Sequence, residues 1–434
     1  MAPIDRRDVG ERDDLERRPL VTPARPNRRE AMAALAGLLA GVPRSAAASD
    51  SALRLRRGVS FHHMLNWPRV AGAGETFRYL WPPFATPEYR TAAEELRRLR
   101  QVGFDFVRLT ADPSIFIAAP AQLRPELIKR AEDAVTQLLS AGLNVVFDLH
   151  AVAVNPAYAP EALVAADAGA PFAAYVEMVG RVAEALKPFP RDRLAFELFN
   201  EPWIDDLAQA PRWQAMLTML YRRARVVDPD RALVLNGLQW DSARGLAALD
   251  ARPFAGEPAL YTFHYYEPRA FTQQGAVPDA RYISGLGWPT RPDEADAALE
   301  RATAQIASDP SLTAAARQQA LNETRGGLAW LREAPHDERR IAEDFAAVAR
   351  WARREGVSAD RVVLGEFGCV AGPAGAPLGE SRLRWLATVR RAAEAQGFGW
   401  ALWLYRGPGG MQLVRGAGRA MDGETLVALG LSAS

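Results

Sequence analysis

Two glutamates lie where an α/β protein would carry reactive carboxyl groups. Glu201 follows the apolar segment 194–199, and Glu366 follows the apolar segment 361–364. Short apolar segments of this kind predict buried strands, and the carboxyl ends of the parallel strands of a barrel meet on one face. A carboxylic acid and a carboxylate that meet there can cleave a glycosidic bond, because one can protonate the leaving oxygen while the other attacks the anomeric carbon.

Six further candidate residues fall at or near the ends of predicted strands. They are Arg108, His150, Asn200, His264, Tyr266 and Trp403. A guanidinium and a phenol favour the ionised form of a nearby carboxyl group, so Arg108 and Tyr266 are expected beside Glu366, the nucleophile. Trp203, two residues after Glu201, is an apolar neighbour that would keep this second carboxyl group protonated as the acid. We therefore expect the two pKa values to differ.

The elements that must position these residues alternate between apolar strands and amphipathic helices, which is typical of a parallel sheet. The predicted strands are 58–61, 106–109, 144–149, 194–199, 232–235, 260–263, 361–364 and 399–404. One of the helices between them is expected over 86–103. A doubly wound sheet would need a glycine-rich phosphate turn after its first strand, and the sequence of 62–65 is HHML. The pattern predicts an α/β fold, a (β/α)₈ TIM barrel.

One connection is much longer than a helix and two loops require. It lies between Tyr266 and Arg361 and contains two helical patterns, 294–308 and 312–332. On a barrel this segment, about 270–335, would be an insertion after strand six on the active-site face. Two interpretations remain open: a lid or wall of a sugar-binding cleft, or an elaboration of the packing.

The first 48 residues have the pattern of an export signal. Arg28 and Arg29 precede the uncharged segment 31–42, and an A-x-A cleavage pattern follows within 45–49. The paired arginines resemble a Tat signal, although a charged leader with a short helix is the alternative. We expect export to the periplasm or the exterior, removal of 1–48, and a single catalytic domain over 49–434. The apolar segment is too short to span a membrane.

Charge, cysteine and histidine content argue against several classes of protein. The sequence has 53 Lys and Arg against 52 Asp and Glu, a formal net charge of +1, which does not favour nucleic-acid binding. Its single cysteine, Cys369, excludes an intramolecular disulfide and a cysteine-based metal cluster. The five histidines show neither H-x-H nor H-x-x-x-H spacing, which argues against a metal-dependent hydrolase. We expect neither a metal nor a cofactor.

Taken in chain order, the candidate segments resemble the motifs of glycoside hydrolase family 5, the cellulase family of clan A. The sequence FNEP at 199–202 resembles the N-E-P motif that ends strand four, and GEFG at 365–368 resembles the nucleophile motif that ends strand seven. Segments that resemble the family's strand-two Arg, strand-three His, strand-six H-x-Y and strand-eight Trp are 107–109, 148–150, 264–266 and 403. The resemblance covers about residues 57–406. It implies a retaining glycoside hydrolase with Glu201 as acid/base and Glu366 as nucleophile.

The resemblance also implies roles for the supporting residues. Arg108 and Tyr266 would orient the nucleophile, and His264 would support the acid/base. The sugar beside the scissile bond would contact two residues and stack on a third; these are His150, Asn200 and Trp403.

The substrate is less closely defined than the chemistry. The family includes enzymes that act on β-1,4-glucan, β-1,3-glucan, β-mannan and glycolipids, and these motifs do not distinguish them. We expect a β-glucan, cleaved as by an endo-β-1,4-glucanase, because that is the family's commonest target. A non-catalytic glycan-binding barrel is the alternative from another functional class, and the presence of both carboxyl groups argues against it.

Several other residues receive a structural interpretation first. Glu197 lies inside strand four and is expected to pair with a basic group in the barrel. Tryptophans predicted on helices are assigned to the core: Trp330, Trp351 and Trp385. Tryptophans in loops of the active-site face, some of which would be platforms for sugar rings, are Trp67, Trp81, Trp203, Trp240 and Trp288. His62 and His63 either line the sugar cleft or pack within the fold.

Overall fold

The computed structural model describes residues 53–371, 378–415 and 419–433. The predicted export signal, residues 1–48, lies outside these ranges.

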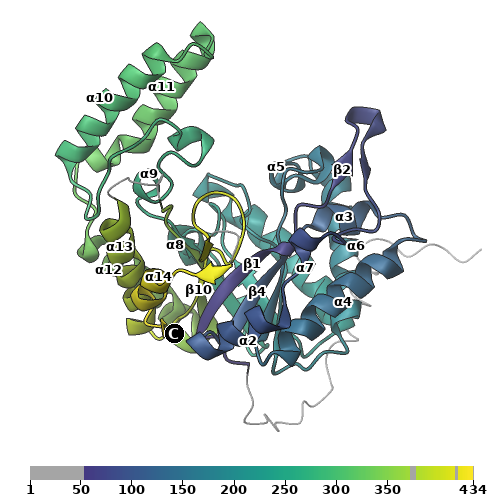
Figure 1. The fold of residues 1–434 in the computed structure, drawn as a ribbon. Coiled ribbons are helices and arrows are strands. Elements are labelled where there is room, and N and C mark those ends of the chain that lie inside the picture. The colour runs from purple at the N-terminus through teal and green to yellow at the C-terminus, as the bar shows by residue number, and fades with distance from the viewer. Residues whose placement is uncertain (1–52, 372–377, 416–418, 434) are drawn as a thin grey trace, which may run out of the picture. The chain divides into compact units, whose positions relative to one another are not determined.

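Eight parallel strands form a closed barrel, as predicted, in the order β1-β10-β9-β8-β7-β6-β5-β4 (Figure 1). The strands are β1 (Arg57–Leu65), β4 (Phe106–Ala111), β5 (Asn144–Leu149), β6 (Leu194–Glu197), β7 (Ala232–Asn236), β8 (Ala259–Tyr265), β9 (Val362–Phe367) and β10 (Gly399–Leu402). β1 closes the barrel by pairing with both β10 and β4. Two short hairpins lie outside it: β2 (Val70–Ala71) with β3 (Arg78–Tyr79), and β11 (Val414–Arg415) with β12 (Ala420–Met421).

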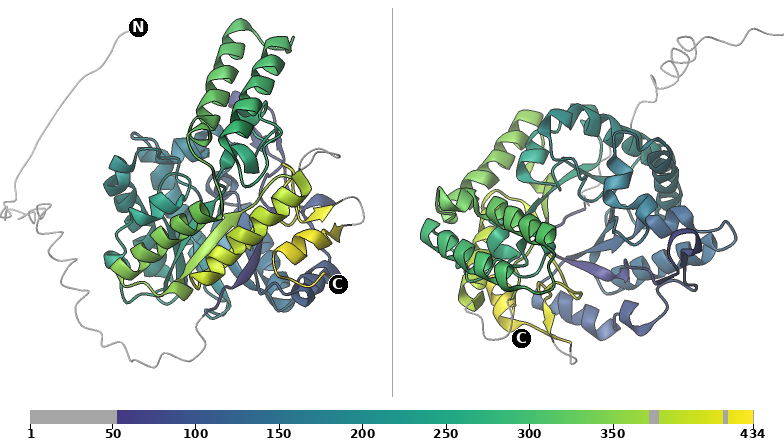
Figure 2. Two further views of the ribbon diagram at one scale, coloured as in Figure 1. Left: turned by 90° about the vertical axis from the view of Figure 1, so that its left-hand side faces the viewer. Right: turned by 90° about the horizontal axis from the view of Figure 1, so that it is seen from above.

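Helices surround the barrel, as Figure 2 shows from above. They are α2 (Ala93–Val102), α3 (Pro113–Ala118), α4 (Arg124–Ser140), α5 (Pro160–Val164), α6 (Gly169–Leu186), α7 (Ala210–Val227), α8 (Ala243–Ala247), α9 (Arg269–Thr272), α12 (Glu338–Glu355), α13 (Leu378–Ala395) and α14 (Gly423–Ala428). Short 3₁₀ helices are η1 (Gly74–Thr76), η2 (Pro87–Tyr89), η3 (Pro156–Tyr158), η4 (Leu207–Gln209), η5 (Arg252–Phe254), η6 (Pro278–Ala280), η7 (Trp330–Arg332) and η8 (Ala359–Arg361). Within the described residues no single helix is long and apolar enough to cross a membrane, and the one bent pair that passes the test of length and composition joins residues 156–164 (η3 and α5) to α6.

The barrel interior changes from apolar to polar along each strand. Side chains of alternate residues point inward, and those near the amino ends form a small apolar cluster that includes Phe106, Val146 and Leu260. Two residues further along the same strands, the buried side chains are Arg108, Asp148 and Thr262. The period of two therefore collects polar groups at the carboxyl ends of the strands, above an apolar base.

The helix expected over 86–103 is divided into two elements. Pro87 begins η2, which ends at Tyr89, and α2 begins only at Ala93. Tertiary contacts explain the break. The Tyr89 hydroxyl donates to the carbonyl of Trp67 at 2.7 Å, and the Thr91 hydroxyl lies 2.7 Å from Nε2 of His63. These contacts hold the intervening residues in an extended conformation against β1, which overrides local helix propensity.

The long segment after β8 forms a helical hairpin of α10 (Pro292–Ser308) and α11 (Ala314–Leu328). The two helices lie side by side and project away from the barrel (Figures 1 and 2). At the base of the hairpin, Thr290 and His336 exchange two backbone hydrogen bonds of 3.0 Å.

Trp330 was assigned to the core, and this assignment is wrong. α11 ends at Leu328, before the tryptophan, because two consecutive glycines at 326–327 weaken the helical pattern that was expected to continue to residue 332. Trp330 lies in η7 with 39% of its surface exposed. Trp351 and Trp385 are fully buried, as predicted.

Candidate active site

Arg108 on β4 is the centre of a buried polar network. Its guanidinium donates two hydrogen bonds to Glu197, Nε to Oε2 at 2.8 Å and Nη2 to Oε1 at 2.7 Å. Nη1 donates to Oε1 of Glu366 at 2.5 Å, and Nη2 also contacts Oδ1 of Asn200 at 2.7 Å and Oδ2 of Asp148 at 3.0 Å. The expected pairing of Glu197 with a basic group is confirmed. A planar guanidinium with acceptors on several sides cannot rotate without losing them, so it fixes four strands relative to one another.

Glu366, on β9, is held by two strong donors. Its Oε1 accepts from Arg108, and its Oε2 accepts from the Tyr266 hydroxyl at 2.8 Å. Only 4% of its side chain is exposed. The preceding residue has to be glycine, because a Cβ on Gly365 would lie 2.2 Å from Oγ1 of Thr262. The two hydrogen bonds thus hold both oxygens of the carboxylate, and the close packing of Gly365 against Thr262 fixes the backbone beside it.

Glu201 has a different environment. Its side chain is 25% exposed, and its Oε1 lies 2.8 Å from Nδ1 of His264. Carboxylate oxygens of Glu201 and Glu366 and a ring nitrogen of His264 all lie within 4.8 Å of one another. The two carboxyl groups therefore lie next to each other, and His264 contacts both of them.

Burial dominates the pKa values of both glutamates. Loss of hydration raises the pKa of Glu201 and that of Glu366 to about 7. At Glu366, the charge of Arg108 and the hydrogen bond from Tyr266 lower the pKa, and the charge of Glu201 raises it. Because both glutamates reach about the same pKa, the expectation that their pKa values differ is wrong. The pair holds about one proton near neutral pH, because two close carboxylates repel each other. The proton belongs on Glu201, since Glu366 is the group with cationic and phenolic donors.

Two histidines beside the glutamates are neutral. Burial lowers the pKa of His150 well below its usual range and lowers that of His264 to about 4. Nδ1 of His150 lies 2.9 Å from Oδ2 of Asp148, so this nitrogen carries the hydrogen. Nε2 is then an acceptor and faces the amide nitrogen of Asn200 at 3.4 Å.

An aromatic cluster lies beside Glu366. The rings of Trp403 and His150 are stacked at 5.3 Å and 10°. His62 packs 4.7 Å from Trp403 and accepts a 2.8 Å hydrogen bond from the indole Nε1 of Trp67. Its other ring nitrogen contacts Oγ1 of Thr110 at 2.9 Å. The position of His62, left open by the sequence, is thus beneath Trp67, a ring that is 47% exposed.

The structure brings all eight sequence-predicted residues into this single network and adds one that the sequence analysis missed. Asp241, in the loop after β7, is fully buried. Its Oδ2 accepts the backbone N–H of Glu201 at 3.0 Å, and its Oδ1 accepts from Nδ2 of Asn236 at 2.7 Å. In the sequence, Asp241 is a single acidic residue a few positions after a predicted strand, and no motif around it indicates a role in the site.

Two sets of three side chains have the proximity that a metal ion would need: Glu197, Asp241 and His264, and Glu201, His264 and Glu366. Each set includes a carboxylate that Arg108 already binds. A cation there would lie close to the guanidinium, and the repulsion at low dielectric is large. We therefore keep the expectation of a metal-independent site.

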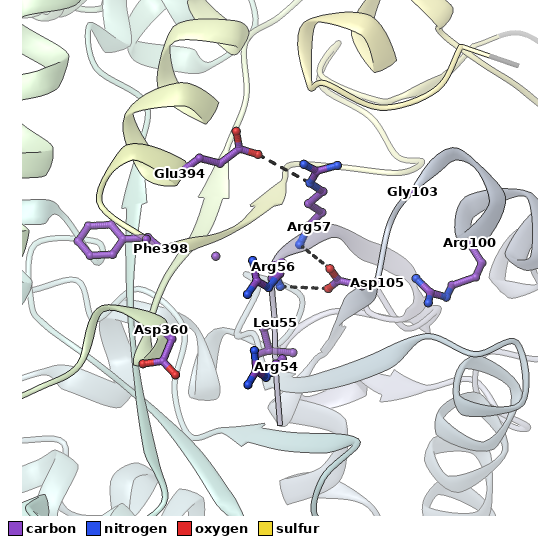
Figure 3. Close-up of a pocket in the computed structure, with 12 residues that line it drawn as sticks. Arg54, Leu55, Arg56, Arg57, Arg100, Gly103, Asp105, Asp360, Glu394 and Phe398 are labelled. Atoms are coloured by element: carbon purple, nitrogen blue, oxygen red, sulfur yellow. Dashed lines mark hydrogen bonds and ion pairs between the residues drawn. The ribbon is translucent and has the colours of Figure 1, made fainter. Parts of the chain in front are cut away.

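A separate cavity of about 560 Å³ lies at the amino-terminal end of the barrel (Figure 3). Its charged lining residues are Arg54, Arg56, Arg57, Arg100, Asp105, Asp360 and Glu394. Asp105 accepts the backbone N–H groups of Arg56 and Arg57, and Nε of Arg57 lies 3.7 Å from Glu394. None of the eight candidate residues lines this cavity. The active sites of (β/α)₈ barrel enzymes lie at the opposite end, at the carboxyl ends of the strands.

Comparison with known proteins gives consistent matches. A family model described as Cellulase (glycosyl hydrolase family 5) matches residues 70–407. The chain is 28% identical to Endoglucanase 3 of Fibrobacter succinogenes over 239 residues, which are 54% of this chain and 33% of that protein. It is 26% identical to Cellodextrinase A of Ruminococcus flavefaciens over 192 residues, 42% of this chain and 53% of that protein. The chain thus matches from a third to about half of the length of these relatives.

Solved structures share the fold. A hyperthermophilic endo-β-1,4-glucanase in complex with substrate superposes with a TM-score of 0.58 and 24% identity, covering 80% of this chain and 91% of that one. Thermotoga maritima Cel5A in complex with cellobiose gives a TM-score of 0.61 at 18% identity, with coverage of 86% and 97%. The same enzyme in complex with mannotriose gives 0.61 at 19% identity, with the same coverage.

Replacing Glu201 with Gln should change how the free energy of unfolding depends on pH. A carboxyl group with a raised pKa contributes stability that is fully present below its unfolded pKa, near 4.5, and is lost as the pH rises through its folded pKa of about 7. An amide does not titrate. Between pH 5 and 8 the wild type should lose about 2 kcal/mol relative to Glu201→Gln, a figure reduced for the partial exposure of the side chain. Denaturant unfolding at both pH values measures the difference.

Glu75→Gln is the control, because Glu75 is an exposed glutamate outside the network. Its stability should follow that of the wild type at each pH. If the Glu201→Gln variant also runs parallel to the wild type, the pKa of Glu201 is not raised by burial.

Proposed function

Since this chain belongs to glycosyl hydrolase family 5, the cellulase family, we propose that this glycosidase hydrolyses a β-glucan with retention of configuration, with Glu366 as nucleophile and Glu201 as acid/base. The observation that carries the proposal is the pair of carboxyl groups with oxygens inside 4.8 Å. Retaining enzymes have carboxyl groups about 5–5.5 Å apart, whereas inverting enzymes need about 6.5–9.5 Å to admit a water. The gap fits the shorter class.

The first step forms a covalent ester. Oε of Glu366 attacks the anomeric carbon, the bond to the leaving oxygen breaks, and the proton of Glu201 passes to that oxygen. Arg108 and the Tyr266 hydroxyl hold Glu366 by the hydrogen bonds described above, so the attacking oxygen arrives in a fixed orientation.

The second step releases the sugar. Glu201, now ionised, takes a proton from water, the hydroxide oxygen attacks the anomeric carbon, and the ester bond to Glu366 breaks. His264 supports Glu201 in both protonation states: with its hydrogen on Nδ1, the neutral imidazole donates to Oε1 whether or not the other carboxyl oxygen carries the proton. Each carboxyl group ends the cycle in the state in which it began.

Aromatic rings on both sides of the glutamates support a chain-like substrate. Trp67 and Trp403 lie on the nucleophile side, and Trp203 and Trp240 lie next to Glu201, with centroids 6.4 Å apart. Three of these rings are broadly exposed, by 47% for Trp67, 45% for Trp203 and 41% for Trp240. Flat apolar rings match the faces of pyranose units, so platforms on both sides favour binding across the scissile bond and endo action.

The names of the relatives favour β-1,4-glucan, since they include an endoglucanase, a cellodextrinase and an endo-β-1,4-glucanase. β-Mannan is the second candidate, because the T. maritima structure has also been determined with mannotriose. Export through residues 1–48 remains part of the proposal and agrees with a polymeric substrate outside the cell.

Removing either carboxyl group should abolish turnover of the polymer. On β-1,4-glucan, Glu366→Gln and Glu201→Gln should each lower kcat by about 10³-fold or more. On 2,4-dinitrophenyl β-cellobioside, whose phenolate leaves without a proton, kcat/KM should stay near the wild-type value for Glu201→Gln and be lost for Glu366→Gln. Glu75→Gln should match the wild type on both substrates.

Hydrolysis that survives in Glu366→Gln would show that the nucleophile is misassigned. A wild-type protein that binds glucans and mannans without cleaving any of them would support the non-catalytic alternative.

The product of the wild-type enzyme should be the β-anomer. Two displacements at one carbon restore its configuration. Proton NMR spectra taken within the first minutes of hydrolysis, before mutarotation, distinguish the β-anomeric signal from the α-anomeric signal. Initial formation of the α-anomer is the inverting result and would exclude the covalent intermediate.

A further inference from the structure

Glu201 has a backbone conformation that must be held by its surroundings. Its φ is +45°, in the left-handed region that non-glycine residues rarely adopt. Such a conformation is strained and persists only where neighbouring structure imposes it. β6 ends at Glu197, so residue 201 is beyond the hydrogen bonds of the barrel ladder. Something outside the strand must keep the acid/base in place.

The loop after β7 supplies the restraint. The backbone N–H of Trp240 donates to the carbonyl of Pro202 at 3.3 Å, and that of Gln239 donates to the carbonyl of Ile204 at 3.1 Å. Oδ2 of Asp241 accepts the N–H of Glu201 itself at 3.0 Å. Three successive residues of this loop also have positive φ, +57° at 239, +52° at 240 and +58° at 241. The loop is thus bent in a way that points its groups at the acid/base.

Asn236 connects Asp241 to the rigid barrel. It is the last residue of β7 and is buried. Its Nδ2 donates to Oδ1 of Asp241 at 2.7 Å and to the carbonyl of Phe199 at 2.9 Å. The amide therefore bridges the two loops and ties both of them to a strand, as a supporting residue does when it orients a reactive group.

Asp241 also adjoins the histidine that contacts the acid. Its carbonyl accepts the N–H of His264 at 2.7 Å, and its Oδ2 lies 3.6 Å from Nε2 of that ring. Nε2 is buried and has no hydrogen-bond partner among the described residues, whereas Nδ1 binds Glu201. The imidazole is held between two carboxyl groups. Burial and the charges of Glu201 and Glu197 raise the pKa of Asp241 well above its usual range, so its effect is positional more than electrostatic.

From these contacts we propose that Asp241 is a positioning residue for proton transfer, which holds Glu201 through its backbone N–H and through His264. The inference rests on the proposed function, because it concerns delivery of the Glu201 proton to the leaving oxygen. Asp241 does not touch the substrate in this account. Its loss should impair reactions that need the acid and spare those that do not.

Asp241→Asn tests the proposal with a side chain of the same shape. The amide has one acceptor where the carboxyl group had two, so its NH₂ must face either Glu201 N–H or the Asn236 amide, and one hydrogen bond is lost. A displacement of about 1 Å at a reacting group can cost about 10²-fold. We expect kcat/KM on β-1,4-glucan to fall by about 10²-fold, and kcat/KM on 2,4-dinitrophenyl β-cellobioside to change by less than about threefold.

Two further variants make the comparison specific. Asp112→Asn is the matched control, since Asp112 is also fully buried and caps α3 through Ser114, with no contact to Glu201. Any loss it causes should be equal on the two substrates. Asn236→Ala removes one arm of the support and should reproduce the unequal loss of Asp241→Asn to a smaller degree. If circular dichroism shows that Asp241→Asn does not fold, the ratio of the losses that Asn236→Ala causes on the two substrates tests the proposal instead.

Each outcome has a defined meaning. An equal fall on both substrates assigns Asp241 to the fold alone and overturns the proposal, as does no fall on either. If the wild type cleaves neither substrate, or if Glu201→Gln shows no difference between them, the proposed function itself fails. If Glu201→Gln distinguishes the substrates and Asp241→Asn does not, the inference about Asp241 fails alone.

Discussion

The buried guanidinium of Arg108 is the interaction on which the active-site face depends. It donates to Glu197, Glu366 and Asn200 and lies 3.0 Å from Asp148, so it connects β4 to the ends of β5, β6 and β9. Burying several carboxyl groups together is unfavourable unless they are paired with a cation or protonated. One arginine cannot neutralise all of them, and the raised pKa values of Asp148, Glu201 and Glu366, each about 7, are the consequence. The proton that the proposed chemistry requires is therefore retained because burial disfavours the charged carboxylates and the single arginine does not offset this effect.

In the proposed mechanism the two carboxyl groups have different roles because different elements support them. Glu366 lies on a strand and accepts from a cation and a phenol. Glu201 lies beyond the end of its strand, and its support comes from the loop after β7 and from His264 on β8. The strand-bound group suits a nucleophile that must attack along one line. The loop-bound group, a quarter of which is exposed, suits an acid that must reach a leaving group and later a water.

Most of the architecture could be predicted from the sequence, because a barrel requires eight apolar strands at regular intervals. Residues at strand ends were identifiable for the same reason, and the structure brings all eight of them together. Strand four was expected to reach residue 199 but ends at Glu197, since the chain turns toward the left-handed conformation at Glu201. The periodicity does not predict the division of the helix over 86–103 or the exposure of Trp330, because tertiary contacts and a pair of glycines outweigh it. The desolvation of Glu366 and the hydrogen bond from Glu201 to Asp241 depend on three-dimensional packing, so no local sequence pattern predicts them.

The central claim is that Glu366 forms a covalent bond to the sugar while Glu201 handles the proton. A 2-deoxy-2-fluoro-β-cellobioside with a reactive leaving group tests it most directly, because the fluorine slows the second step and allows the ester to accumulate. Peptide mass spectrometry of the trapped protein should find the fluoroglycosyl group on Glu366. A label on Glu201, or rapid hydrolysis of the natural substrate without any adduct of the fluorosugar, would contradict the account.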